Sequence, residues 1–402
     1  MKFALLVPDG MWDVPVKSLG GKTPLQVANT PNMDRLAKEG MIGLVHTVPE
    51  GFHPGSDVAN MSLLGYNPSS YYSGRAPLEA ANLGVDIGEQ EVAFRCNFVT
   101  VSSGKMVDYS AGHISTSEAE YLIDDLNRAL GSDSIRFFSG TSYRNLLVMK
   151  DKDFRDFLKV KCTPPHDIIG KEIAPYLPSC DNKRIEKALV DLIIASQDVL
   201  AKAQVNKVRI DLKENPATMI WLWGQGIGVD MPAFKEKFGI EGALISAVDL
   251  LKGLGRKIGL DIIEVEGATG YYDTNYRGKA QAGIDALRDK DFVMIHVEAT
   301  DEAGHNGHID EKIKAIERFD QVIVKTVAEY MKEVGGRILV APDHPTPVAL
   351  RSHTSDPVGF VLWGGGVPAS GAVDFSEASA SGADVVVPSG EELARLFLKE
   401  GV

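Results

Sequence analysis

The chain has 402 residues, a length that predicts two or three domain-sized units. Its 44% hydrophobic and 24% charged residues are ordinary globular values, which excludes a wholly disordered or coiled-coil chain. The 42 Lys and Arg against 55 Asp and Glu give a net charge of −13, so binding to nucleic acid or to an anionic membrane surface is not expected, although a local basic pocket for a small anion remains allowed.

The cysteines and the apolar runs limit the compartment. Three cysteines are too few and too scattered for a disulfide framework or a four-cysteine zinc site, and we expect reduced thiols. No apolar run is long enough to span a membrane, and the apolar start of the chain is too short for a signal peptide. We therefore expect a cytoplasmic protein.

The first predicted element is a strand over Phe3–Val7, an unbroken apolar run of the kind that parallel sheets bury on both faces. Asp9 follows its carboxyl end, which is where open α/β sheets bind ligands. A helix comes next, with Thr30 as its N-cap, Pro31 in its first turn and Gly40 at its end.

The middle of the chain has a different pattern. Alternating stretches, typical of strands, mix with helical stretches, namely Val92–Val101, Arg144–Lys150, Thr116–Leu130 and Ile185–Ala203. We predict that residues 82–210 form an inserted α+β domain. The interrupted α/β domain would consist of residues 1–81 and 211–402 and would include the apolar run Ala217–Trp223 as a core strand.

Strands and helices alternate again near the end of the chain. The predicted strands are Phe292–Val297, Arg337–Ala341 and Gly359–Trp363, and the 3.6-residue apolar period between Asp310 and Met331 predicts one helix. This alternation indicates a mostly parallel sheet flanked by helices.

Carboxylates and imidazoles lie at or soon after these strand ends. They are Asp9, Asp301, His305, Asp343, His344 and His353. Oxygen and nitrogen donors without thiolate suit Zn or Mn, and six such ligands exceed the needs of one ion, which favours two. Any one of them taken alone is better explained as a loop residue with satisfied hydrogen bonds, whereas the six together favour metal binding.

Ser56 is the candidate nucleophile. It follows Pro54 and Gly55, a turn that exposes the next side chain, and Val58–Leu64 can form a helix behind it. A hydroxyl beside a divalent cation at a helix N-terminus loses its proton more easily, and the helix end can receive a phosphate. The alternative reading is a helix N-cap.

Four separated segments resemble, in order, the motifs of the alkaline phosphatase superfamily, and more closely those of its cofactor-independent phosphoglycerate mutases. The segments are Ser56–Gly65, Asp301–His305, Ala341–His344 and Ser352–Thr354. Further matches are similar to the shorter, archaeal-type branch, including Pro8–Gly10, Lys22–Leu25, Thr30–Asn32, Trp221–Gly226 and Asp273–Tyr276. The resemblance covers nearly the whole chain and implies an alkaline-phosphatase-like core.

The resemblance implies two divalent ions, which are Mn, Zn, Mg or Co in such enzymes. One ion would be held by Asp301, His305 and His353, and the other by Asp9, Ser56, Asp343 and His344. The implied activity is interconversion of 3-phosphoglycerate and 2-phosphoglycerate, with Ser56 carrying the phosphoryl group between the two hydroxyls.

Substrate binding by such an enzyme needs groups that grip anions and exclude water. Arginine binds carboxylate and phosphate bidentately, which makes Arg95, Arg144 and Arg209 of the insert candidates for a substrate-binding lid. His113 resembles the family's substrate-side histidine, a proton carrier between hydroxyls. Lys279 is the available substitute for a phosphate-binding lysine whose motif is missing here.

Other functions stay open at this point. The same metal and serine core serves phosphatases and phosphotransferases on other small alcohols, and relatives have been proposed as homoserine kinases. No P-loop or kinase glycine loop occurs in the sequence, which weakens the kinase reading. A non-catalytic metal-binding protein would not need Ser56. The expected partner is a small phosphorylated metabolite, and the oligomeric state is not predicted.

Overall fold

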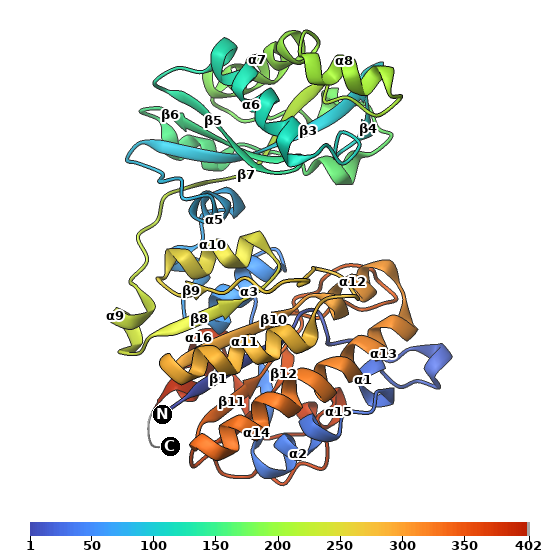
Figure 1. Cartoon of the computed structure of the whole chain (residues 1–402), viewed down its shortest axis with the longest axis vertical. Coiled ribbons are helices and arrows are strands. Elements are labelled where there is room, and N and C mark those ends of the chain that lie inside the picture. Colours follow the sequence, from blue (N-terminus) through green and yellow to red (C-terminus); the bar gives the residue numbers. More distant parts are fainter. Residues whose placement is uncertain (400–402) are drawn as a thin grey trace. The chain divides into compact units, whose positions relative to one another are not determined.

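The computed structural model describes residues 1–399 and divides the chain into two compact units (Figure 1). The first unit contains Met1–Tyr72 and the chain from Met231 onward, and the second is Ser73–Asp230. The insert is therefore longer at both ends than the 82–210 expected from the sequence. The added segments are a helix and a strand that pack within the insert.

The first unit is built on an eight-stranded sheet of order β13-β2-β12-β11-β1-β10-β8-β9. Its strands are β1 (Phe3–Pro8), β2 (Met41–Val45), β8 (Gly242–Ile245), β9 (Asp261–Ile262), β10 (Phe292–Val297), β11 (Arg337–Val340), β12 (Val358–Gly364) and β13 (Val386–Val387). β1 runs parallel to both β10 and β11, whereas β12 is antiparallel to β11 and β2. This confirms a mostly parallel sheet.

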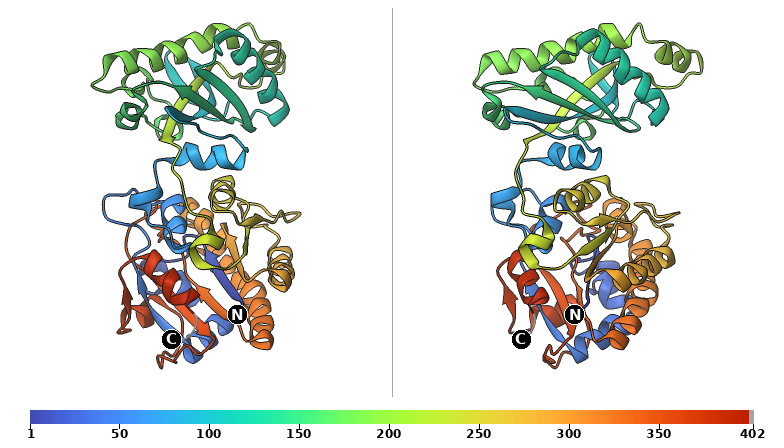
Figure 2. Two further views of the ribbon diagram at one scale, coloured as in Figure 1. Left: turned by 90° about the vertical axis from the view of Figure 1, so that its left-hand side faces the viewer. Right: turned by 60° about the vertical axis from the view of Figure 1, so that its left-hand side comes forward.

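Helices lie on both sides of this sheet (Figure 2). The longer ones are α2 (Pro31–Glu39), α3 (Ser56–Leu63), α10 (Asp249–Lys257), α11 (Tyr276–Asp289), α12 (Ala299–Asn306), α13 (Ile309–Arg318), α14 (Lys325–Val334) and α16 (Gly390–Leu398). The short ones are α1 (Pro24–Val27), α4 (Pro68–Tyr71), α9 (Phe234–Phe238) and α15 (Glu377–Ser381). As predicted, α2 starts after Thr30 with Pro31 in its first turn and ends at Gly40.

The insert is a five-stranded antiparallel sheet with helices on both faces. Its elements are α5 (Arg75–Asn82), β3 (Glu91–Ser102), β4 (Lys105–Asp108), α6 (Thr116–Leu130), β5 (Ile135–Thr141), β6 (Arg144–Lys150), α7 (Lys183–Leu200), α8 (Gln204–Asp211) and β7 (Met219–Ile227). Along β3, Phe94 and Cys96 join the core that α6 and α7 cover, whereas Ala93 joins the small core under α5. The two-residue period of a strand therefore places Arg95 on the α5 face.

One expectation was wrong. The apolar run Ala217–Trp223 belongs to β7, which pairs with β3 in the insert, because an unbroken apolar run indicates burial on both faces but not which sheet buries it. The helix expected over Asp310–Met331 is present as α13 and α14, which a π-helical turn at Phe319–Val324 joins without a break. In this turn the buried carboxylate of Asp320 accepts the backbone N–H of Met33 at 2.7 Å.

Between Met1 and Lys399, no helix is long and apolar enough to cross a membrane.

Candidate active site

Three parallel neighbours, β1, β10 and β11, end at the same edge of the large sheet, and each leads into acidic residues. Asp9 follows β1, Asp301 lies in the first turn of α12 after β10, and Asp343 follows β11. The backbone N–H of Gly10 donates to Asp343 Oδ1 at 3.1 Å, which joins two of these ends. The topology thus brings together carboxylates that are more than 290 residues apart in the chain.

One half of the cluster surrounds Asp301. His305 Nε2 lies 3.3 Å from Asp301 Oδ2, and His353 Nε2 lies 3.3 Å from Asp301 Oδ1. The two Nε2 atoms are only 2.7 Å apart. Such a short distance between two ring nitrogens requires a proton or a cation between them, because two lone pairs at that distance repel each other.

The other half surrounds Asp9 and contains Ser56. Ser56 Oγ lies 3.3 Å from Asp9 Oδ2 and 3.1 Å from His344 Nε2, and this imidazole nitrogen lies 3.5 Å from Asp343 Oδ2. The ligand atoms of His344 also approach those of Asp301 and His353 within 4.8 Å. The contact with Ser56 leads us to place His344 in the Asp9 half, at the border between the two.

Ser56 is the first residue of α3, and the N-cap is Gly55. Its side chain makes no capping bond, so the helix-cap explanation of Ser56 is wrong. Asn60, one turn later, donates to the Ser56 carbonyl and to Asp343 Oδ2, both at 2.8 Å. The buried amide of Asn60 therefore ties the start of α3 to the acidic cluster.

Three carboxylates, Asp9, Asp301 and Asp343, converge here, and no lysine or arginine within residues 1–399 forms an ion pair with them. Burial and the charges of Asp343 and Asp301 raise the pKa of Asp9 well above its ordinary value. Burial alone would raise the pKa of Asp301, but hydrogen bonds with His305 and His353 hold this pKa well below its ordinary value. Burial lowers the pKa of His344, which favours the neutral imidazole that can bind a metal.

The donor set fits divalent cations. It consists of carboxylate oxygens, imidazole nitrogens and one hydroxyl, the ligands that Zn and Mn accept. In addition, Asp9 Oδ1 is buried and has no hydrogen-bond partner in the described part of the chain. An unpartnered buried carboxylate oxygen is costly unless a cation binds it.

Sequence reasoning missed two residues behind this cluster and assigned a third, Lys279, to the substrate. His296 Nε2 lies 3.1 Å from Asp9 Oδ2, and Glu298 Oε1 lies 3.1 Å from His296 Nδ1. Lys279, expected at the substrate, is fully buried and donates to Glu298 Oε2 at 2.9 Å. The available signal was the spacing of His296 and Glu298, because two polar residues two apart at the end of an apolar strand share one face.

The remaining predicted residues lie in the insert, where the structure brings His113 and Arg144 to the same tyrosine. The His113 ring is 6.2 Å from the Tyr143 ring, and Arg144 donates to the Tyr143 hydroxyl at 3.0 Å. Arg144 is exposed and has no carboxylate partner within residues 1–399. A guanidinium in this state is available to an anionic ligand.

Arg95 and Arg209 already have partners. Arg95 pairs with Glu79 at 3.0 Å and stacks over the Trp223 ring at 4.1 Å. Arg209 donates to Glu118 at 3.0 Å and to the carbonyl of Ala111 at 2.9 Å, close to the turn that carries His113. Arg209 thus supports the backbone of that turn.

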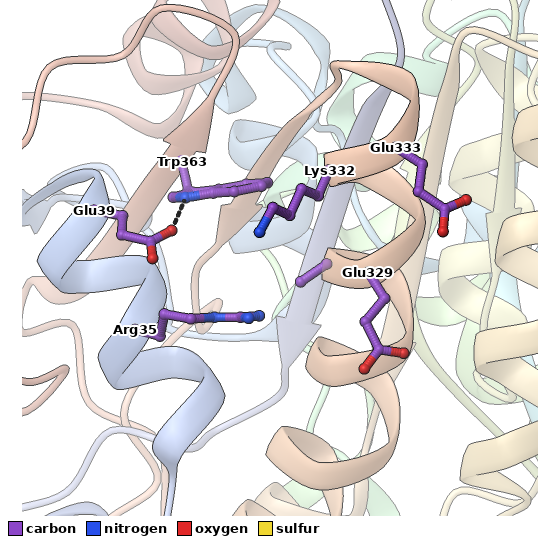
Figure 3. Close-up of a pocket in the computed structure, with 7 residues that line it drawn as sticks. Arg35, Glu39, Glu329, Lys332, Glu333 and Trp363 are labelled. Carbon is purple, nitrogen blue, oxygen red and sulfur yellow. Dashed lines mark hydrogen bonds between the residues drawn. The ribbon is translucent and has the colours of Figure 1, made fainter.

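A pocket between α2, α14 and β12 lies elsewhere on the first unit (Figure 3). Trp363, one of its lining residues, donates to Glu39 at 3.0 Å, and it pairs with Ile338 near the start of β11. The pocket therefore lies at the opposite edge of the sheet from Asp343. Its lining has two basic side chains, Arg35 and Lys332, against three glutamates, so it is not a basic pocket for an anion.

The large sheet, with its polar cluster at one edge and its inserted unit, places the chain among the discontinuous α/β proteins whose site lies at the carboxyl ends of parallel strands. Comparisons with known proteins then give the family. The family model described as 2,3-bisphosphoglycerate-independent phosphoglycerate mutase matches residues 37–206. A relative of that name from Methanosarcina mazei is 48% identical over 99% of this chain and 100% of its own.

Solved structures agree. A protein from Pyrococcus horikoshii has a TM-score of 0.80 and 29% identity, covering 100% of this chain and 99% of its own. A cofactor-independent phosphoglycerate mutase from Thermoplasma acidophilum has a TM-score of 0.68 and 30% identity, covering 99% of each chain. The chain belongs to the 2,3-bisphosphoglycerate-independent phosphoglycerate mutase family, which confirms the resemblance found in its motifs.

Proposed function

We propose that this protein interconverts 3-phosphoglycerate and 2-phosphoglycerate through a phosphorylated Ser56. The names of the relatives carry this activity. The observation that supports the mechanism is the position of Ser56 Oγ, at the first residue of α3 and 3.1 Å from His344 Nε2. A hydroxyl placed there is not used to cap the helix, and it lies among groups that can bind cations.

Two divalent ions are part of the proposal. Asp301, His305 and His353 would hold one, and Asp9, Ser56, Asp343 and His344 would hold the other. When bound, such ions supply positive charge that lowers the pKa of a ligated hydroxyl and stabilises the charge of a transferring phosphoryl group. Mn, Zn, Mg and Co are all compatible with oxygen and nitrogen donors of this kind.

The chain's own groups perform two transfers. In the first, the deprotonated Ser56 Oγ forms a bond to phosphorus while the bond to the 3-oxygen of the substrate breaks, and the 3-oxygen takes a proton from His113. In the second, His113 takes the proton of the 2-hydroxyl as that oxygen attacks the phosphoserine, and Ser56 Oγ leaves in its deprotonated form. The N–H groups and the dipole at the start of α3 stabilise the negative charge of the phosphoryl group, both on the substrate and on Ser56.

The insert would bind the rest of the substrate. We propose that Arg144, which has no carboxylate partner within residues 1–399, binds an anionic group of the phosphoglycerate, and that His113 beside the same tyrosine carries the proton between the two hydroxyls. Keeping water from the phosphoserine would also be a task of this lid, because hydrolysis would otherwise end the cycle.

The test is a product assay. The purified full chain, supplied with Mn²⁺, is given 3-phosphoglycerate in the absence of 2,3-bisphosphoglycerate, and 2-phosphoglycerate and free phosphate are followed together. Conversion to 2-phosphoglycerate is expected. Release of phosphate alone would assign a phosphatase, and no reaction would refute the proposal.

A further inference from the structure

A series of buried charged side chains, each in contact with the next, leads from Asp9 into the first unit. His296 is completely buried near the end of β10, and its two ring nitrogens face two carboxylates, Asp9 and Glu298, each at 3.1 Å. Glu298 in turn receives the ammonium of Lys279 at 2.9 Å. Charged and polar groups thus alternate over four residues with no access to solvent.

Glu298 is the carboxylate that fixes this series of side chains in place. Besides Lys279 and His296, it accepts the Ser246 hydroxyl and the backbone N–H of Ala247, both at 3.0 Å. The opposite charge of Lys279 and the bonds from His296 outweigh burial and hold the pKa of Glu298 below its ordinary value, so this carboxylate is ionised. A fixed anion at this point orients the His296 ring.

This series of side chains determines which oxygen of Asp9 remains available to a cation. His296 and Ser56 both approach Oδ2, whereas Oδ1 is a buried oxygen without a hydrogen-bond partner among residues 1–399. His296 Nε2 makes no well-aligned hydrogen bond in these residues either, so its hold on Asp9 is the 3.1 Å contact between the imidazole and the carboxylate. The backbone of Asp9 is also held, because the Thr300 hydroxyl donates to its carbonyl. Main chain and side chain are therefore both fixed before a cation arrives.

We propose that His296, Glu298 and Lys279 are positioning residues that hold Asp9 in the orientation in which Oδ1 binds the ion next to Ser56. The inference rests on the proposed two-ion function. It gives Lys279 a role through Glu298 rather than at the substrate. Partners that orient a metal-binding side chain typically contribute 10- to 100-fold in metal affinity.

Two substitutions of His296 separate positioning from packing. The amide of Gln reaches roughly the place of Nε2 and can still donate to Asp9, whereas the shorter Asn places its amide near Nδ1, toward Glu298. Both remove the ring, so a role in packing alone affects them alike. Glu298→Gln is the third variant, because it keeps His296 but removes the anion that orients it.

The measurement is binding of Mn²⁺ to the chelator-treated full chain, followed through the electron paramagnetic resonance signal of free Mn²⁺. We expect His296→Asn to weaken one of the two Mn²⁺ sites about 10- to 100-fold. His296→Gln should recover part of that affinity, and Glu298→Gln should change the same site in the same direction. The other site should keep its parental affinity in all three.

Arg337→Met is the control for destabilisation. Arg337 is also fully buried, but it lies at the start of β11, where it donates to the carbonyl of Gly365 at 2.7 Å, far along the strand from Asp343. Its variant should bind both ions normally. Parental affinities in His296→Asn, or equal losses in the Asn and Gln variants, would overturn the proposal. These binding constants are obtained without substrate, so they are independent of whether the product assay succeeds.

Discussion

Replacing Ser56 by alanine tests the nucleophile directly, and the structure predicts very different effects on stability and on turnover. Ser56 Oγ makes two hydrogen bonds, of 3.1 and 3.3 Å, and caps no helix. Each neutral hydrogen bond contributes about 1 kcal/mol net, so the free energy of unfolding should fall by about 2 kcal/mol at most. A domain of ordinary stability remains folded after such a loss.

Turnover should fall far more, because the proposed acceptor of the phosphoryl group is gone. We expect a loss of at least about a thousandfold, which corresponds to about 4 kcal/mol in the activation barrier. The assay is conversion of 3-phosphoglycerate with Mn²⁺ present, together with labelling of the protein from phosphate-labelled substrate. The parent should become labelled, and Ser56→Ala should not.

Ser62 provides the matched control on the same helix. It is buried, and its Oγ has no hydrogen-bond partner in the part of the chain that the structure describes. Ser62→Ala should therefore keep parental turnover and labelling. If Ser56→Ala retained turnover within about tenfold of the parent, a barrier change of about 1.4 kcal/mol, the assignment of the nucleophile would be refuted.

Three other measurements test the rest of the site and the fold. Arg144→Ala should lose charge-assisted bonds of about 1.5–3 kcal/mol, or roughly 10- to 100-fold in kcat/KM, and should release more free phosphate per 2-phosphoglycerate formed. Arg136→Ala, which breaks a surface pair with Glu91, should change neither quantity. Chelation should abolish turnover and Mn²⁺ should restore it, with a decline below about pH 6 as protons compete for the imidazoles; full activity after chelation would contradict the two-ion proposal. Burial raises the pKa of Glu377 to about 7 in the folded protein, above its pKa in the unfolded chain. Folding is therefore favoured while Glu377 is protonated, and the free energy of unfolding falls as the pH rises from the unfolded pKa toward 7. In urea unfolding, Glu377→Gln should gain roughly 3 kcal/mol over the parent at pH 8 but little at pH 4, and parallel pH profiles would contradict this.

The sequence predicted the elements that carry the site because each signal was local. Phe292–Val297 is the strand β10 as expected, and Thr116–Leu130 is the helix α6 as expected. Asp9 and Asp343 follow parallel strands, so the rule that strand ends meet at one edge was sufficient to place them together.

What the sequence did not show depends on partners distant in the chain. His296 stands inside an apolar run, and only the pairing of β10 with β1 brings it to Asp9. Lys279 was expected at the substrate, because its partner Glu298 comes from another element and the sequence gives no sign of their pairing. The place of β7 was missed for the same reason, since strand pairing is not encoded in a run of apolar residues.

The connectivity of the large sheet has a consequence for how the molecule is made. β1 is synthesised long before its two neighbours, β10 and β11, which begin only at Phe292 and Arg337. β1 can therefore pair with both neighbours only after the residues through β11 have left the ribosome. Closing the long loop between β1 and these strands is slow. The insert, Ser73–Asp230, is continuous and contains all of its own sheet, so it can fold earlier. Until β10 and β11 have been made, the apolar strand β1 lacks both of its neighbours in the sheet and is open to aggregation or to capture by a chaperone.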